Sequence, residues 1–91
     1  MAAKKTSNSK ATGPITIRVT RRNAGPVDGR YQAELIRSDV ERLKLEPEHG
    51  FPGEHPALHR AGSDTAAVAG VKRKIAASGW AVGRATIIRD Y

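Results

Sequence analysis

Residues 63–91 read SDTAAVAGVKRKIAASGWAVGRATIIRDY, and this stretch decides the fold class. Ser63 and Asp64 are both residue types that cap the N-terminus of a helix. Apolar residues then recur at the spacing of one helical face; they are Ala67, Val68, Val71 and Ile75. Gly79 is suited to end the helix, because it adopts a left-handed conformation at no steric cost. We therefore expect a helix near 64–78 and then a strand near 80–89.

The phase of this last strand requires a bulge. Strict alternation from Trp80 would place Arg84 on the same face as Val82, which mixes a charge into the core. A bulge at Gly83 restores an apolar face. The residues expected on the core side are then Trp80, Val82, Ala85 and Ile87, and those expected outside are Arg84, Thr86 and Ile88.

The N-terminal half predicts a hairpin. Apolar residues at 15, 17 and 19 alternate with polar ones, and residues 31, 33 and 35 do the same. Between these runs, residues 23–29 (NAGPVDG) are rich in the residue types that form turns. We expect two paired strands over about 15–22 and 30–37.

The middle of the chain carries weaker signals. Ser38 and Glu41 have the spacing of a capping box, which predicts a short helix near 39–45. Residues 46–62 (EPEHGFPGEHPALHRAG) hold three Pro, three Gly and three His. This composition predicts a long irregular loop.

These elements predict a single α+β domain over residues 15–91. Its sheet has three strands in ββαβ order, formed by the hairpin and a third strand beside the first. The main helix packs on one face of this sheet, and a short extra helix and a long loop complete the fold. Residues 1–14 are rich in Lys, Ser and Thr and poor in apolar residues, so we expect a flexible basic arm.

Composition excludes several classes of site. The 91-residue chain has no Cys, which rules out disulfides, thiolate metal sites and cysteine nucleophiles. No apolar run approaches the length that spans a bilayer, so we predict no membrane partner. We expect a cytoplasmic protein, or a virion component if the chain comes from a phage.

No motif for catalysis or for a cofactor is present. The sequence holds no Gly-x-Ser-x-Gly elbow and no glycine-rich phosphate loop. His55 and His59 are four residues apart, as in zinc helices, but the residues between them supply no carboxylate base. We predict that the protein is not an enzyme and holds no metal or cofactor, with His49, His55 and His59 given no role.

Charge is the main functional signal. Sixteen Lys and Arg against nine acids give a net charge of +7, which is typical of proteins that bind nucleic acid. If the apolar residues of the hairpin point inward, Arg18, Arg22 and Arg30 share the outer face, and Arg84 joins them through the bulge. We predict that these arginines bind the phosphates of DNA or RNA. Basic residues of the arm would add diffuse attraction; they are Lys4, Lys5 and Lys10.

Two other interpretations remain open. The arginines could instead line a solvated face and pair with Glu34. The protein could also be a protein-interaction module, such as a small phage-encoded inhibitor or a virion structural or assembly protein. Such a module would bind a partner or a second copy through the helix, a sheet edge or the long loop. Residues 72–74 (KRK) spread over about 200° of a helix and form no single patch.

Overall fold

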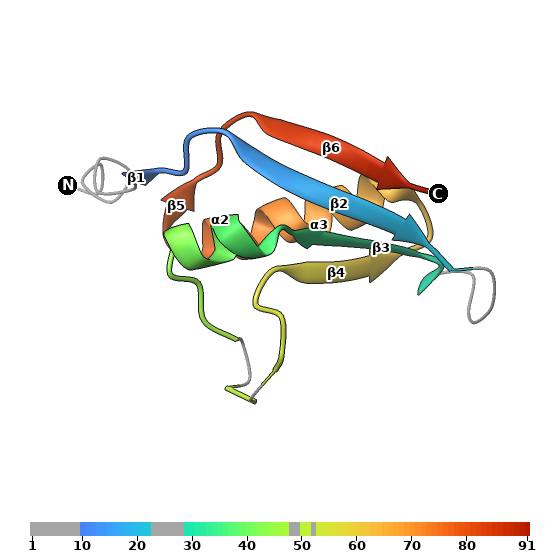
Figure 1. The fold of residues 1–91 in the computed structure, drawn as a ribbon, viewed down its shortest axis with the longest axis horizontal. Coiled ribbons are helices and arrows are strands. Elements are labelled where there is room, and N and C mark those ends of the chain that lie inside the picture. The colour runs from blue at the N-terminus through green and yellow to red at the C-terminus, as the bar shows by residue number, and fades with distance from the viewer. Residues whose placement is uncertain (1–9, 23–28, 48–49, 52) are drawn as a thin grey trace.

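The computed structural model describes residues 10–22, 29–47, 50–51 and 53–91. Its elements are β1 (Lys10–Ala11), β2 (Ile15–Arg21), β3 (Tyr31–Leu35), α2 (Arg37–Arg42), β4 (Leu58–Ala61), α3 (Asp64–Ala77), β5 (Trp80–Ala81) and β6 (Ala85–Asp90). Within these residues, a 4-stranded sheet has the order β4-β3-β2-β6, and β1 pairs with β5 in a separate 2-stranded sheet. Figure 1 shows α3 running across one face of the larger sheet.

The α+β class is confirmed, but the three-stranded arrangement is wrong. The final strand does lie beside the first, because β6 pairs with β2 in parallel register. The extra strand is β4, which pairs antiparallel with β3. It falls in the segment expected to be an irregular loop, where it places Tyr31 opposite Ala61 and Glu34 opposite Leu58.

The core lies between the sheet and α3. Alternate residues of β2 and β3 point toward the helix and are fully buried, as the two-residue period predicts. The helix contributes its predicted face, on which Ala67, Val71 and Ile75 are also fully buried. The strand residues of this core are Ile15, Ile17, Val19, Ala33 and Leu35.

The C-terminal strand is interrupted rather than bulged. Residues 82–84 separate β5 from β6, and the Gly83 amide donates to the Thr12 hydroxyl at 2.8 Å. A Cβ at Gly83 would lie 2.6 Å from the carbonyl oxygen of Gly13, so only glycine fits here. The face assignment was correct, since Trp80, Val82, Ala85 and Ile87 pack against the core.

The end of the expected arm is part of the fold. Lys10 and Ala11 form β1, and Thr12 is buried with its backbone amide donating to Ala81 at 3.0 Å. Residues 1–9 of the arm lie outside the described residues.

Helix α2 is not capped as predicted. It begins at Arg37 after an extended Ile36, and no side chain caps it. Ser38 therefore lies inside the helix, and the expected capping box with Glu41 does not form. Asp39 instead joins α2 to β2, because its Oδ2 accepts from the Thr16 amide at 2.9 Å.

The ends of α3 match the sequence. The Ser63 side chain accepts a hydrogen bond from the Ala66 amide, and Gly79 follows the helix with a φ of 96°. One contact at the N-terminal end of α3 was not predicted. Asp64 accepts a hydrogen bond from Arg89 at 2.9 Å and another from the Tyr91 hydroxyl at 3.1 Å. These bonds lower the pKa of Asp64 and tie the C-terminal residues to the helix. Of the described helices, none is long and apolar enough to cross a bilayer.

Candidate nucleic-acid interface

The sheet has one face that α3 does not cover, and arginines from two strands share it. Because the odd-numbered residues of β2 are buried under the helix, the even-numbered residues point away from it. Arg18 is exposed on this open face. The Arg22 amide donates to the Arg30 carbonyl at 2.7 Å, which continues the register of β2 and β3 and places these two residues opposite each other.

The Arg22–Arg30 pair concentrates positive charge at the hairpin end of the sheet. Directly opposed residues on antiparallel strands have Cα atoms about 5.5 Å apart when they are hydrogen-bonded. Arg22 is exposed and Arg30 is half-buried. The Nε of Arg30 is buried and has no hydrogen-bond partner among the described residues. Two arginine side chains that extend from opposite positions on paired strands can both contact one anion.

A fourth arginine reaches the same face from β4. Arg60 is opposite Gln32 in the register of β3 and β4, and its Nε donates to the Gln32 Oε1 at 2.9 Å. The sequence reasoning missed Arg60 because residues 58–61 were assigned to a loop. These residues read Leu-His-Arg-Ala, which does not alternate between apolar and polar, so they carry no strand signal among the surrounding prolines and glycines. We call Arg18, Arg22, Arg30 and Arg60 the arginine face.

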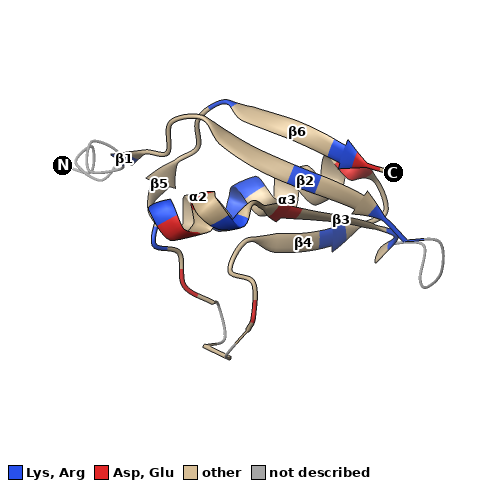
Figure 2. Cartoon of the chain, in the orientation of Figure 1, with Lys and Arg blue, Asp and Glu red and all other residues tan. Residues whose placement is uncertain are grey.

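Two acids also lie on the open side of the sheet. Glu34 is opposite Arg18, and Asp90 is opposite Thr20. Among the described residues, however, the ion pairs do not include one between Arg18 and Glu34. The arginine face therefore keeps an excess of positive charge. Figure 2 shows Lys and Arg on β2, on β4 and at the hairpin end of this sheet.

The other predicted binding residues lie away from the Arg22–Arg30 pair. Arg84 is exposed just before β6, where its carbonyl accepts from the Ile15 amide at 3.0 Å. Seven residues of extended chain, about 23 Å, separate Ile15 from Arg22. Arg84 therefore lies at the end of the sheet away from the Arg22–Arg30 pair, and four residues of extended chain, about 13 Å, separate its level from that of Arg18. Lys10 is exposed in β1, and Lys4 and Lys5 lie outside the described residues.

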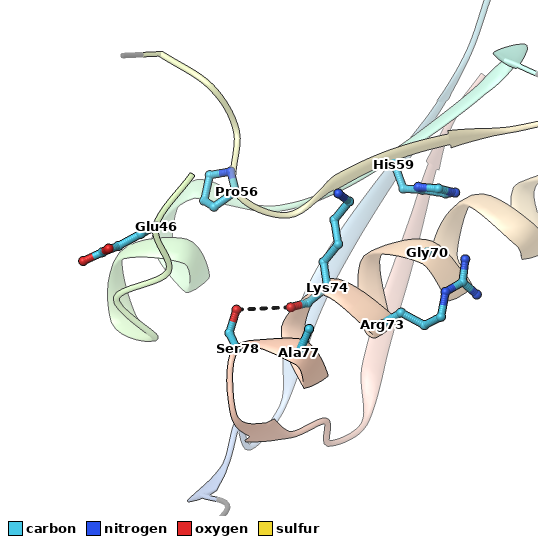
Figure 3. Close-up of a pocket in the computed structure, with 8 residues that line it drawn as sticks. All are labelled: Glu46, Pro56, His59, Gly70, Arg73, Lys74, Ala77 and Ser78. Carbon is cyan, nitrogen blue, oxygen red and sulfur yellow. Dashed lines mark hydrogen bonds between the residues drawn. The ribbon is translucent and has the colours of Figure 1, made fainter. Parts of the chain in front are cut away.

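A pocket of about 450 Å³ lies between α3 and the chain leading into β4 (Figure 3). Its lining residues are Glu46, Pro56, His59, Gly70, Arg73, Lys74, Ala77 and Ser78. Burial lowers the pKa of His59, and the charges of Arg73 and Lys74 lower it further. The imidazole is therefore neutral at pH 7. Glu46 lines the same pocket as the two cations and offsets part of their charge.

His55 has a structural role. Its Nδ1 accepts from the Ala57 amide at 3.0 Å, so its Nε2 carries the proton and donates to the Leu35 carbonyl at 3.0 Å. Both ring nitrogens are thus occupied, and burial lowers the pKa of the ring. The described residues include no group of three or more His, Asp or Glu arranged to hold a metal ion, and His49 lies outside them.

Comparison of the chain with protein-family models, with curated proteins and with solved structures finds no match. Function is therefore inferred from the geometry of the chain itself, in which the arginine face gathers four cations on one side of the larger sheet.

Proposed function

We propose that this protein binds nucleic acid, through contacts between the arginine face and backbone phosphates, as a non-enzymatic accessory component. The observation that carries this proposal is the Arg22–Arg30 pair, joined across two strands by a 2.7 Å backbone bond. Guanidinium groups donate in a fork that matches two phosphate oxygens. Arg18 and Arg60 extend the same charge along and across the sheet.

The residues around the arginines favour backbone contact over base reading. Thr16, Thr20 and Gln32 lie on the same face and can donate neutral hydrogen bonds to phosphate. A sheet that stacks single-stranded bases needs aromatic rings among its cations. Tyr31 instead points to the helix side, where its ring meets that of Tyr91 with centroids 5.7 Å apart. We therefore expect binding with little dependence on sequence.

Affinity measured against salt tests this proposal. Four phosphate contacts predict a slope of about −3 to −4 for log K against log salt, and about a hundredfold loss of affinity between 50 and 200 mM salt on duplex DNA. The double variant Arg22→Gln/Arg30→Gln removes two of these contacts, so its slope should be shallower by about 2. Fluorescence anisotropy with labelled duplex and single-stranded oligonucleotides measures both quantities.

The matched control is Lys72→Gln/Arg73→Gln. It removes the same two charges from exposed positions of α3, on the other side of the sheet. We expect this control to keep a slope close to that of the wild type. The proposal is wrong if the wild type does not bind at about 50 mM salt, if added salt leaves binding unchanged, or if both double variants lose the same affinity.

Binding of a protein partner is the second candidate function, and the unpaired edge of β6 favours it. Among the described residues, β6 is hydrogen-bonded only to β2, so its other side is open. The side of α3 that carries Gly70 is less suitable, because His59 already covers Gly70.

A further inference from the structure

The outer edge of β6 presents a regular row of backbone groups. The Arg84 carbonyl accepts from the Ile15 amide, and β6 then runs parallel to β2 from Ala85 to Asp90. In a parallel pair, alternate residues direct both their N–H and C=O groups to the partner strand. The even-numbered residues therefore face β2. Ala85, Ile87 and Arg89 direct theirs outward, where no other described strand pairs with them.

This edge lacks two of the usual protections against pairing, which are a very short strand and a proline. It is six residues long and contains no proline. Its Ile88 side chain is 46 % exposed on the open face of the sheet. An open edge with an exposed apolar residue can pair with another strand.

The residues of β6 are complementary to a second, antiparallel copy of themselves. A two-fold axis at Ile87 pairs Ile87 with its own copy and Ala85 with Arg89, which brings all the outward backbone groups into hydrogen-bonded pairs. The same register places Ile88 opposite Thr86 and Arg84 opposite Asp90. Opposite charges thus meet twice, once on each side of the axis. The small Ala85 side chain leaves room for Arg89, which is held toward α3 by Asp64.

We propose that this protein forms a homodimer by antiparallel pairing of β6 with β6, in the register that joins Arg84 of each copy to Asp90 of the other. The pairing makes one continuous sheet with both α3 helices on one side and both arginine faces on the other. It does not depend on nucleic acid binding. It also gives a role to Arg84, which lies at the end of the sheet away from the Arg22–Arg30 pair.

Sedimentation equilibrium on nuclease-treated protein tests the pairing. The wild type should show a reversible monomer–dimer equilibrium. Arg84→Asp places two Asp–Asp pairs across the interface, and Asp90→Arg places two Arg–Arg pairs there. Each variant should weaken dimerisation by about tenfold or more, because like charges directly opposite each other on paired strands are destabilising.

The two variants also provide a test of register. A mixture of Arg84→Asp protein with Asp90→Arg protein restores both opposite-charge pairs, so the mixture should form a heterodimer more readily than either variant forms a homodimer. The double variant Arg84→Asp/Asp90→Arg should dimerise like the wild type. Lys72→Asp is the control, since it changes an exposed residue of α3 by the same charge.

Three results would overturn the proposal. One is a wild type that stays monomeric at the highest concentration reached. Another is a dimer that neither single reversal weakens. The last is a mixture of the two variants that associates no better than each alone. Circular dichroism of every variant checks that loss of the dimer is not loss of the fold.

Discussion

At the scale of single residues, Gly70 and His59 determine how α3 packs against β4. Gly70 is buried in the middle of the helix, where glycine is normally unfavourable. The structure explains it: a Cβ at this position would overlap the imidazole of His59. The neighbour that Gly70 contacts is β4, a strand that the sequence did not predict.

This contact predicts that Gly70→Ala changes the stability in opposite directions in the wild type and in the His59→Ala variant. In the wild type, Gly70→Ala should destabilise the protein by about 1 kcal/mol, because the displaced imidazole costs more than the gain in helix propensity. In the His59→Ala background, the same substitution should stabilise by about 0.5–1 kcal/mol. Urea unfolding of the four proteins measures the cycle. A Gly70→Ala protein more stable than the wild type would refute this packing.

Features of single residues were predictable when they depend only on residues nearby in the sequence. The Ser63 cap and the Gly79 helix end were predictable, since each requires only neighbouring residues. Ser38 shows the opposite case. Its spacing to Glu41 fits a capping box, but Asp39 bonds to the distant Thr16 amide and the helix starts earlier. Sequence spacing carries no information on such a tertiary bond.

At the scale of elements, β4 is the strand that the sequence pattern did not predict. Strands β2 and β3 were predictable because each alternates over five residues or more. Strand β4 has four residues and exists through pairing with β3 and packing on α3. Arg60 was missed together with the strand that positions it. The open face of β2, by contrast, followed directly from its alternation.

The segment leading into β4 is held by His55, which predicts a dependence on pH. Burial lowers the pKa of His55 and of His59 below 6.5 in the folded protein. The unfolded chain then binds protons more readily than the folded one. Stability is therefore fully present above pH 6.5 and falls as the pH drops below it. Thermal unfolding midpoints at pH 7.5, 6.5 and 5.5 should decrease in that order.

The variant His55→Asn isolates this contribution. Asn does not titrate in this range, and its side-chain oxygen can accept from the amide two residues on, as Nδ1 of His55 does from Ala57. It loses the bond to the Leu35 carbonyl, so it should be less stable than the wild type at pH 7.5. Its midpoint should fall less between pH 7.5 and 5.5. An equal fall in both proteins would show that His55 does not cause the pH dependence of stability.

At the scale of the whole molecule, the fold separates two surfaces of different chemistry. The arginine face lies on the side of the sheet that α3 leaves open, and the β6 edge runs along the sheet opposite β4 (Figure 1). The expected grouping of Arg18, Arg22 and Arg30 on the open side agrees with the register. Arg84 was grouped with them from the phase of its strand, and it lies at the end of the sheet away from Arg22 and Arg30. Phase gives the face of a sheet but not the position along it.

Mapping by NMR tests the phosphate-binding role of the arginine face most directly. Amide chemical shifts of ¹⁵N-labelled protein are followed while a short DNA duplex is added at low salt. We predict that the largest changes fall on β2, β3 and β4, around Arg18, Arg22, Arg30 and Arg60, while the amides of Lys72 and its α3 neighbours move little. Changes confined to α3 or to the pocket beside it, or no changes at all, would contradict the account.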